Sequence, residues 1–443
     1  MIAAIDFGAS TTKTAVLRSY GGQAELVQVG GSMEFPSAIY LAEDGTVEVG
    51  ERAVALQGRD PLRFDASLKQ RINHRTPVNA MQRVVRLGSD DSLPLLDAVT
   101  AIVRHALSAA VDLLGSAPER LVLTHPAAWR KAERAVLAAA ARAAGFAGKP
   151  EFASEPESAA HYHLADNKSL RKPVAVFDLG ASTFDAAVLA DDDGRLVPRF
   201  QEGRLIGGDD FDTAILDLVA KRLPAADGAR FGQLRVSDRW VYDLADEARE
   251  LKERLSTEEE AYFAFDDLED VLITRADFDD AIRASVEGCV AVLDDAIDAL
   301  PSTSRLGSVV LSGGSARVPL VRELVRDLAG RHAAAILTAQ DKVGPGHVVA
   351  LGAVRIPQPP PPPEPPKVRY SSPSPVAEEP PKSPSIRDIV VATASTGSVP
   401  DLIVGVIRDN QEKIEKAKAF GRAVAEAQKD VYRSMFGWPR KKK

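Results

Sequence analysis

The feature that most constrains this chain is an internal repeat. Residues 2–17, IAAIDFGASTTKTAVL, align with residues 174–189, VAVFDLGASTFDAAVL, at a constant offset of 172, and nine of the sixteen positions are identical. Each copy predicts an apolar strand that ends in aspartate, a tight turn rich in glycine and hydroxyl residues, and a second strand. Two such hairpins so far apart predict two related lobes, with a cleft where the two turns meet.

The rest of the sequence favours an α/β fold. Short β-branched runs, such as residues 121–124 and 174–177, alternate with long segments of helical period, such as residues 130–144. Proline then dominates, because 13 of the 29 prolines lie between residues 357 and 384. We therefore predict a first lobe over 1–170, a second lobe over 171–356, a disordered Pro-rich linker over 357–400, and an amphipathic helix with a basic tail over 401–443.

Composition excludes several classes of protein. The formal charge of −8 argues against a surface that coats nucleic acid, because phosphate neutralisation needs clustered Lys and Arg. No stretch approaches the roughly 20 apolar residues of a membrane span. Residues 1–6 lack the basic start of a secretory signal, and the single cysteine, Cys289, cannot close an intrachain disulfide. We therefore expect a cytoplasmic protein without a transmembrane segment.

The two predicted turns have the composition of a polyphosphate site. Backbone N–H groups in a turn of small residues can point at a phosphate, and Ser and Thr hydroxyls add further donors. Lys13 can neutralise phosphate charge, whereas Asp185 holds the same place in the second copy and could orient an attacking water. The aspartate that begins each turn is suited to holding the water shell of Mg²⁺. The phosphate-binding candidates are Gly8, Ala9, Ser10, Thr11, Lys13, Gly180, Ala181 and Ser182, and the metal candidates, acting through water, are Asp6 and Asp178.

Three further motifs carry less information about function when each is taken alone. Residues 8–14, GASTTKT, resemble a P-loop superficially, but they lack the glycine before Lys13 and are predicted to join two strands. His161 and His163 have no third metal ligand at a recognisable spacing, which favours a packing role. Residues 311–317, LSGGSAR, follow an apolar strand and precede a helical run, so their Gly-Gly turn would let a flat ligand approach the backbone.

In their order along residues 1 to about 356, these motifs resemble the actin-like ATPase superfamily. Within it they are most similar to the DnaK-type heat-shock chaperones of the seventy-kilodalton class. Residues 207–212 (GGDDFD) and 273–278 (ITRADF) are more typical of these chaperones than of actins or sugar kinases. The other similar motifs are the two phosphate motifs at 5–8 and 177–185, the connecting strand at 123–127, the relay arginine at Arg134, the Glu-Pro motif at 155–156 and the adenosine motif at 312–319.

The resemblance implies two duplicated ribonuclease H-like lobes that bind ATP or ADP with Mg²⁺ and hydrolyse ATP slowly as the lobes open and close. It implies that Thr183 and Asp185 orient the hydrolytic water, and that Glu155 supports the metal or water shell beside Asp6 and Asp178. Gly207 and Gly208 would join the phosphate site. The implied nucleoside contacts are Lys252, Ser256, Gly313, Gly314, Ser315 and Arg317.

The sequence departs from the family pattern in three places. Val54 stands where the resemblance places a catalytic lysine, which leaves Lys13 as the candidate substitute. Gly346 stands where the family has an aspartate that meets the ribose, which predicts a weaker hold on the nucleoside. The roughly 87 residues after 356 are too few, and too disordered in composition, for the peptide-binding domain of such chaperones.

These features predict a DnaK-like, ATP-hydrolysing nucleotide switch. An unknown protein partner would bind through the Pro-rich linker or the C-terminal helix. The alternatives are a nucleotide-binding scaffold without catalysis, which Val54 and Gly346 favour, and an actin-like filament protein or a small-molecule kinase, which Lys13 favours.

Overall fold

The computed structural model describes residues 1–19, 21–73, 84–87, 91–166, 173–192, 195–237, 241–301, 304–339 and 343–357. All of these belong to the first of two compact units, Met1–Pro360 and Pro361–Lys443. The predicted Pro-rich linker beyond residue 357 and the predicted C-terminal helix lie outside the described residues.

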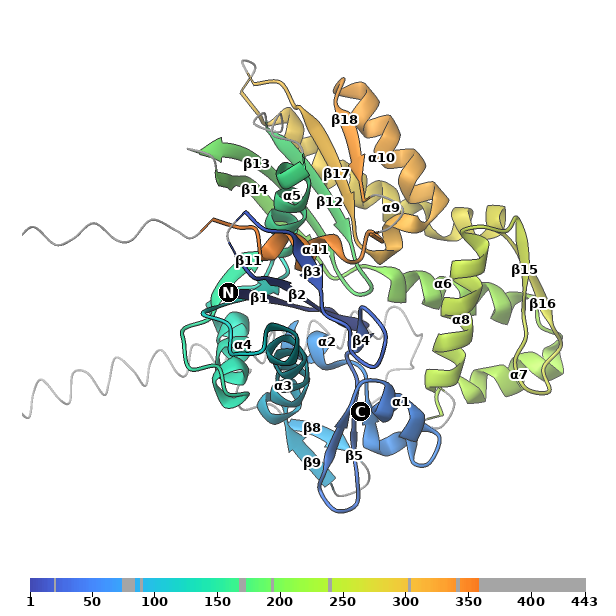
Figure 1. Ribbon diagram of the computed structural model, residues 1–443. Coiled ribbons are helices and arrows are strands. Elements are labelled where there is room, and N and C mark those ends of the chain that lie inside the picture. The colour runs from blue at the N-terminus through green and yellow to red at the C-terminus, as the bar shows by residue number, and fades with distance from the viewer. Residues whose placement is uncertain are drawn as a thin grey trace, which may run out of the picture. The chain divides into compact units, whose positions relative to one another are not determined.

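Both predicted hairpins are present, and each begins a sheet with the same strand order (Figure 1). In both sheets the hairpin's first strand also pairs in parallel with a later strand, which pairs in parallel with the edge strand. The first sheet contains β11 (Glu151–Ser154), β10 (Arg120–His125), β1 (Ile2–Phe7), β2 (Thr11–Leu17) and β3 (Ala24–Leu26), with β4 (Phe35–Pro36) paired to β2. The second contains β14 (Arg195–Arg204), β13 (Phe184–Asp192), β12 (Val174–Leu179), β17 (Ser308–Ser312) and β18 (Ala335–Thr338).

Alternate residues of the hairpin strands pack into opposite cores, and this alternation builds the layers. Ala3 and Ile5 pack with helices α3 (Leu95–Leu114) and α4 (Lys131–Ala143) on one face of the first sheet. The alternate residues Ile2 and Ala4 join a core that also holds Val174 from the second sheet. Helices α5 (Glu155–Asp166) and α11 (Val348–Ala353) lie in that shared core, between the sheets (Figure 1). The far face of the second sheet is covered by α9 (Arg275–Asp298) and α10 (Pro319–Arg331). Helix α6 (Gly208–Arg222) packs against α9, and α8 (Val241–Leu255) packs against α6, so the same core continues beyond the sheet.

The two central helices meet at a position that requires glycine. A Cβ at Gly352 of α11 would lie 1.8 Å from the carbonyl oxygen of Ser158 on α5. This close approach lets both helices fit between the sheets. The repeat in the sequence therefore corresponds to a repeat in space, and the predicted α/β fold with duplicated units is confirmed.

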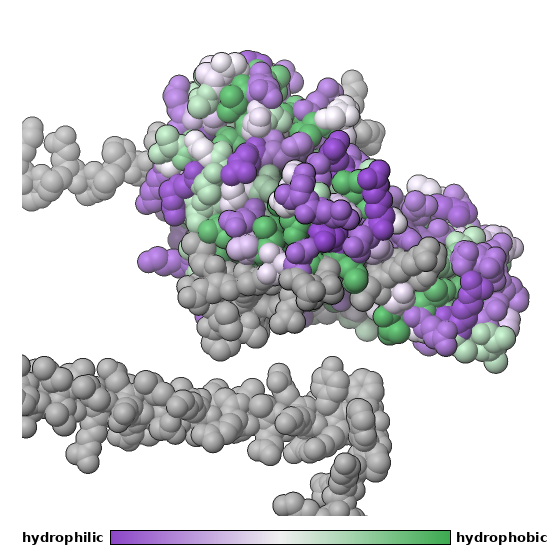
Figure 2. Space-filling view, turned by 90° about the horizontal axis from the view of Figure 1, so that it is seen from below, coloured by the Kyte–Doolittle hydropathy of each residue, from purple (hydrophilic) through white to green (hydrophobic). Residues whose placement is uncertain are grey.

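Smaller elements extend the two halves. The chaperone-like motif at 273–278 begins α9, where the Thr274 hydroxyl accepts a hydrogen bond from the N–H of Asp277 and the Asp277 carboxylate accepts one from the N–H of Thr274. The part built from α7 (Ala225–Leu234), α8, β15 (Glu260–Phe263) and β16 (Val271–Thr274) presents a mainly hydrophilic surface in the view from below (Figure 2). The remaining elements are α1 (Glu51–Gln57), α2 (Leu68–Asn73), β5 (Ile39–Leu41), β6 (Val47–Val49), β7 (Phe64–Asp65), β8 (Val84–Leu87) and β9 (Asp91–Pro94), with 3₁₀ turns at Pro61–Arg63 and Gly314–Arg317.

Candidate functional site

The two hairpins place different side chains opposite their aspartates. In the first hairpin Asp6 is the strand partner of Lys13, whereas in the second Asp178 is the partner of Asp185. The first turn needs glycine, because a Cβ at Gly8 would lie 2.2 Å from the carbonyl oxygen of Thr11. The repeat therefore preserves the backbone and reverses one charge.

Four carboxylates gather in the interior of the site. Asp6, Glu155, Asp178 and Asp185 are all buried, and Glu155 begins helix α5. Burial, together with the negative charges of Glu155 and Asp6, raises the pKa of Asp178 to about 7. Burial and the charge of Glu155 likewise raise the pKa of Asp185 well above its usual value. The structure thus brings these four predicted residues together as one acidic cluster.

Lys69 is the buried cation within this acidic cluster, and the sequence analysis missed it. Its Nζ lies 2.8 Å from Oε1 of Glu155, and its side chain is only 4% exposed. Burial alone would lower the pKa of Lys69, but the negative charges of Glu155 and Asp6 raise it above the usual value.

The site therefore holds a buried lysine that does not come from the segment around Val54. Val54 lies on an exposed part of α1, whereas Lys69 on α2 projects into the site. The sequence did hold a signal, since Lys69 is the only lysine between Lys13 and Lys131 in a stretch that otherwise uses arginine.

Lys13 lies at the first turn, where a neighbouring carboxylate contacts it. Its Nζ lies 3.4 Å from Oε2 of Glu34, and the Thr11 hydroxyl donates to the same oxygen at 3.0 Å. Burial would raise the pKa of Glu34, but Lys13 and Thr11 lower it below its usual value. His347, at the start of α11, has Nε2 3.8 Å from the same Glu34 oxygen. Glu34 therefore contacts two of the predicted phosphate-binding residues.

The end of β10 connects the two halves of the site. The Thr124 hydroxyl donates to Oδ1 of Asp6 at 2.8 Å, and the backbone N–H of Ala127 donates to Oδ1 of Asp185 at 2.6 Å. Burial lowers the pKa of His125 to about 4, so this ring is neutral near pH 7. The segment that resembles the family's connecting strand thus contacts one aspartate from each hairpin.

The second turn is held by its surroundings. The carbonyl oxygen of Gly180 accepts hydrogen bonds from the Gly208 N–H at 3.0 Å and the Ser315 hydroxyl at 2.8 Å. A Cβ at Gly207 would lie 2.4 Å from the carbonyl oxygen of Ala181. Because the N–H groups of Gly207 and Gly208 donate to Asp210 and Gly180, both glycines support the turn through these bonds, and their contact with phosphate stays a prediction.

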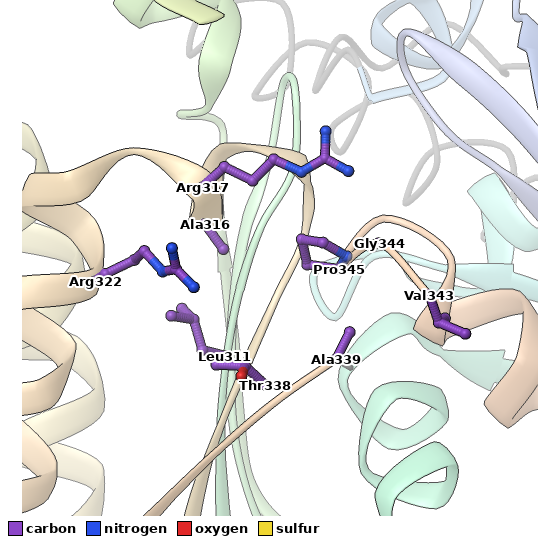
Figure 3. A pocket seen from close by; sticks show the side chains of 9 residues that line it. All are labelled: Leu311, Ala316, Arg317, Arg322, Thr338, Ala339, Val343, Gly344 and Pro345. Atoms are coloured by element: carbon purple, nitrogen blue, oxygen red, sulfur yellow. The ribbon is translucent and has the colours of Figure 1, made fainter. Parts of the chain in front are cut away.

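The predicted nucleoside residues lie around this second turn. Gly313 has φ of 87°, and a Cβ there would lie 2.1 Å from the carbonyl oxygen of Leu179, so the backbone passes close to the end of β12. Lys252 is buried, with Nζ 2.6 Å from Oδ1 of Asp212, and it also donates to the carbonyl oxygen of Gly208 at 3.1 Å. The Ser256 hydroxyl donates to the carbonyl oxygen of Lys252. Arg317 lines a cavity of about 240 Å³ (Figure 3).

Comparison with known protein families shows which family this chain belongs to. The family model described as Hsp70 protein matches residues 90–357, which is more than half of the sequence. The chain belongs to the Hsp70 family. It is therefore a nucleotide-binding protein of the chaperone family. The Hsp70 match begins after the first hairpin, so the equivalence of residues 2–17 with the second hairpin rests on the repeat and on the shared strand order.

Among the described residues, no helix combines the length and the apolar character that crossing a membrane requires.

Proposed function

We propose that this Hsp70-family protein binds ATP together with Mg²⁺ between its two hairpin turns and hydrolyses it slowly. The observation that carries the proposal is the acidic cluster, in which four buried carboxylates share one buried lysine. So much buried negative charge is unfavourable unless a cation binds with the substrate.

The donor set of the acidic cluster suits Mg²⁺. Mg²⁺ prefers oxygen ligands and keeps several of its waters, and buried Asp6 and Asp178 offer carboxylate oxygens from opposite hairpins. When bound, Mg²⁺ would neutralise charge on the phosphate oxygens. Asp6 and Asp178 would hold its water shell, and Glu155 would stay paired with Lys69.

The turns supply donors for the phosphates. Ser182 Oγ is buried and has no hydrogen-bond partner among the described residues, which suits a donor awaiting a ligand oxygen. Ser10, Thr11 and the backbone of Gly8 and Ala9 would face the phosphates from the first hairpin, with Lys13 adding positive charge. Gly180, Ala181 and Ser182 would do so from the second hairpin.

Hydrolysis would take place beside the second hairpin. Thr183 is buried next to Ser182, and Asp185 is fixed by the Ala127 N–H. We propose that these two side chains orient the attacking water, while Lys69 stabilises charge that develops on the transferred phosphate.

The contacts across the site suggest how nucleotide could move the two halves. Residues 124–127 contact Asp6 and Asp185, so a ligand that shifts either aspartate acts on this segment. We propose that this coupling makes the protein a nucleotide switch, and that segments beyond residue 357 bind a protein partner.

One alternative retains support. A scaffold that binds nucleotide without hydrolysis was favoured by Val54 and Gly346, and Lys69 removes the first of these reasons. Gly346 still offers no side chain to a ribose.

The test of binding is calorimetric titration of ATP into the full chain, with Mg²⁺ or with EDTA. We expect Mg²⁺-dependent binding that Asp178→Asn weakens at least tenfold, with Asp217→Asn, an exposed surface site, as the control. Equal affinity in Mg²⁺ and EDTA would contradict the proposed metal role.

A further inference from the structure

Three side chains that can bind a metal ion meet where helices α9 and α10 end, outside the acidic cluster. Asp294 and Asp298 lie one turn apart on α9, and His332 follows the last residue of α10. Each side chain offers one ligand atom, and these three atoms all lie within 4.8 Å of one another. We call this group the α9–α10 cluster, and none of its residues belongs to the site proposed to bind ATP.

The backbone that carries the α9–α10 cluster is fixed by packing. The two helices contact each other (Figure 1), and Leu293 of α9 lies in the same core as Leu328 of α10. The N–H of Ala334 donates to the carbonyl oxygen of Ala329 at 2.9 Å, which closes the turn after α10 and holds the backbone of His332. The protein core therefore places the three side chains together before any ion binds.

The negative charge at this end of α9 is only partly balanced. The C-terminus of a helix carries partial negative charge, so carboxylates are unfavourable there, and the last turn of α9 holds no basic side chain. Arg331 pairs with Oδ2 of Asp294 at 2.6 Å. Asp298 is exposed, and no residue in the described part of the chain forms an ion pair with it. A bound cation would offset the negative charge that remains.

The contacts of Asp294 leave one of its oxygens for a metal ion. Arg331 holds Oδ2, whereas Oδ1 lies 2.6 Å from Nε2 of His332. Carboxylates that bind metals are commonly oriented by a hydrogen bond to the other oxygen. Zinc binds imidazole nitrogen and carboxylate oxygen at about 2.0–2.2 Å, which separates the ligand atoms of a tetrahedral site by about 3.3 Å. Because Asp298 is exposed, its side chain can rotate inward to reach that separation.

We propose that Asp294, Asp298 and His332 form a zinc site that joins the ends of α9 and α10. Oδ1 of Asp294, a carboxylate oxygen of Asp298 and Nε2 of His332 are the protein ligands, and water fills the fourth position. Zinc replaces the hydrogen bond between Asp294 and His332, so the imidazole binds in its neutral form with its proton on Nδ1. The imidazole nitrogen favours zinc over Mg²⁺, which prefers oxygen ligands.

The experiment is a calorimetric titration of zinc chloride into the full chain without nucleotide, with excess Mg²⁺ present to occupy the acidic cluster. We expect saturable zinc binding that Asp298→Asn and His332→Ala each weaken at least tenfold. Since Asp298 is exposed, Asp298→Asn tests the site even if His332→Ala fails to fold. The matched control is Asp295→Asn, which removes an exposed carboxylate from the same turn of α9 and should bind zinc like the wild type. Asp178→Asn should also bind zinc like the wild type, because it changes only the acidic cluster.

Three outcomes would overturn the inference. One is equal zinc affinity in the wild type and Asp298→Asn. Another is equal weakening by Asp295→Asn and Asp298→Asn, because zinc would then respond to negative charge in general and not to a ligand. The third is zinc binding that Asp178→Asn removes, because the ion would then lie in the acidic cluster. The titration contains no nucleotide, so a failure of the proposed ATP binding leaves its result unchanged.

Discussion

The two hairpins share a backbone pattern but differ in how their turns are supported. The second turn is fixed by the backbone of Gly208 and by the Ser315 hydroxyl, both bonded to the carbonyl oxygen of Gly180. Donors of the first turn, Thr11 and Lys13, are instead contacted by the Glu34 carboxylate. A duplicated backbone thus carries two kinds of chemistry. We infer that Lys13 gives the first hairpin a positive charge for the phosphates, whereas Asp185 gives the second hairpin a carboxylate that positions water.

The largest expected effect comes from removing the cation that serves both hairpins. Lys69→Ala should reduce single-turnover ATP hydrolysis by roughly 100-fold or more, because buried charge stabilisation in a transition state is worth several kcal/mol. The matched control is Lys221→Ala, an exposed lysine near the end of α6. Unchanged hydrolysis in Lys69→Ala would show that the buried pair with Glu155 is only structural.

The second prediction distinguishes the role of Lys13 from that of Asp185, the strand partners of Asp6 and Asp178. Lys13→Ala should weaken ATP binding about tenfold, since it removes a positive charge near the phosphates. Asp185→Asn should leave ATP affinity within a few-fold and slow hydrolysis more than tenfold. Calorimetry and quenched-flow assays on both variants test this division. If both variants lose affinity to the same extent, the proposed difference between the hairpins does not exist.

The third prediction concerns pH and the buried carboxylate of the second hairpin. The pKa of Asp178 is raised to about 7, so the folded protein holds this proton more tightly than the unfolded chain does. This group therefore lowers the stability of the ligand-free protein as pH rises from about 4 to about 7. Asp178→Asn should stabilise the ligand-free protein at pH 8, by at most about 4 kcal/mol, and have little effect near pH 4.

Urea unfolding of the wild type and Asp178→Asn at both pH values measures this effect. A variant that is less stable than the wild type at pH 8 would contradict the claim that ionised, buried Asp178 destabilises the ligand-free protein. The gain in stability should accompany the loss of Mg²⁺-dependent ATP binding, as expected for a group retained for function.

The smallest expected effect lies at the first turn. Glu34→Gln should strengthen ATP binding about two- to fivefold, because the bound phosphate no longer displaces a carboxylate from Lys13 and Thr11. The gain should shrink as salt screens the charges. Glu25→Gln, an exposed glutamate paired with Arg18, provides the control. Weaker binding in Glu34→Gln would mean that Glu34 helps to hold the nucleotide.

Much of the fold could be predicted because the hairpins are local patterns that occur twice. The apolar strands and the small-residue turns predict both hairpins, and the turn composition identifies Asp6 and Asp178 without any tertiary information. That Ile2 and Val174 pack into one shared core is known only from the structure. The helix expected at 130–144 forms as α4, and the run before the Gly-Gly turn forms as β17.

The missed residues act through contacts between distant segments. Lys69 meets Glu155 across 86 positions of sequence, and Thr124 meets Asp6 across 118. No periodicity or turn composition marks either contact, so sequence reasoning did not identify Lys69 as a site residue. The boundary between the lobes at residues 170 and 171 stays a prediction, as do the roles proposed for the site residues.

The most direct test of the central claim is single-turnover hydrolysis of ATP by the full chain in Mg²⁺, beside Thr183→Ala. We predict slow hydrolysis that requires Mg²⁺ and that Thr183→Ala reduces at least tenfold while it still binds ATP. Tight ATP binding without hydrolysis, or equal rates in the two proteins, would contradict the account and leave a nucleotide-binding scaffold.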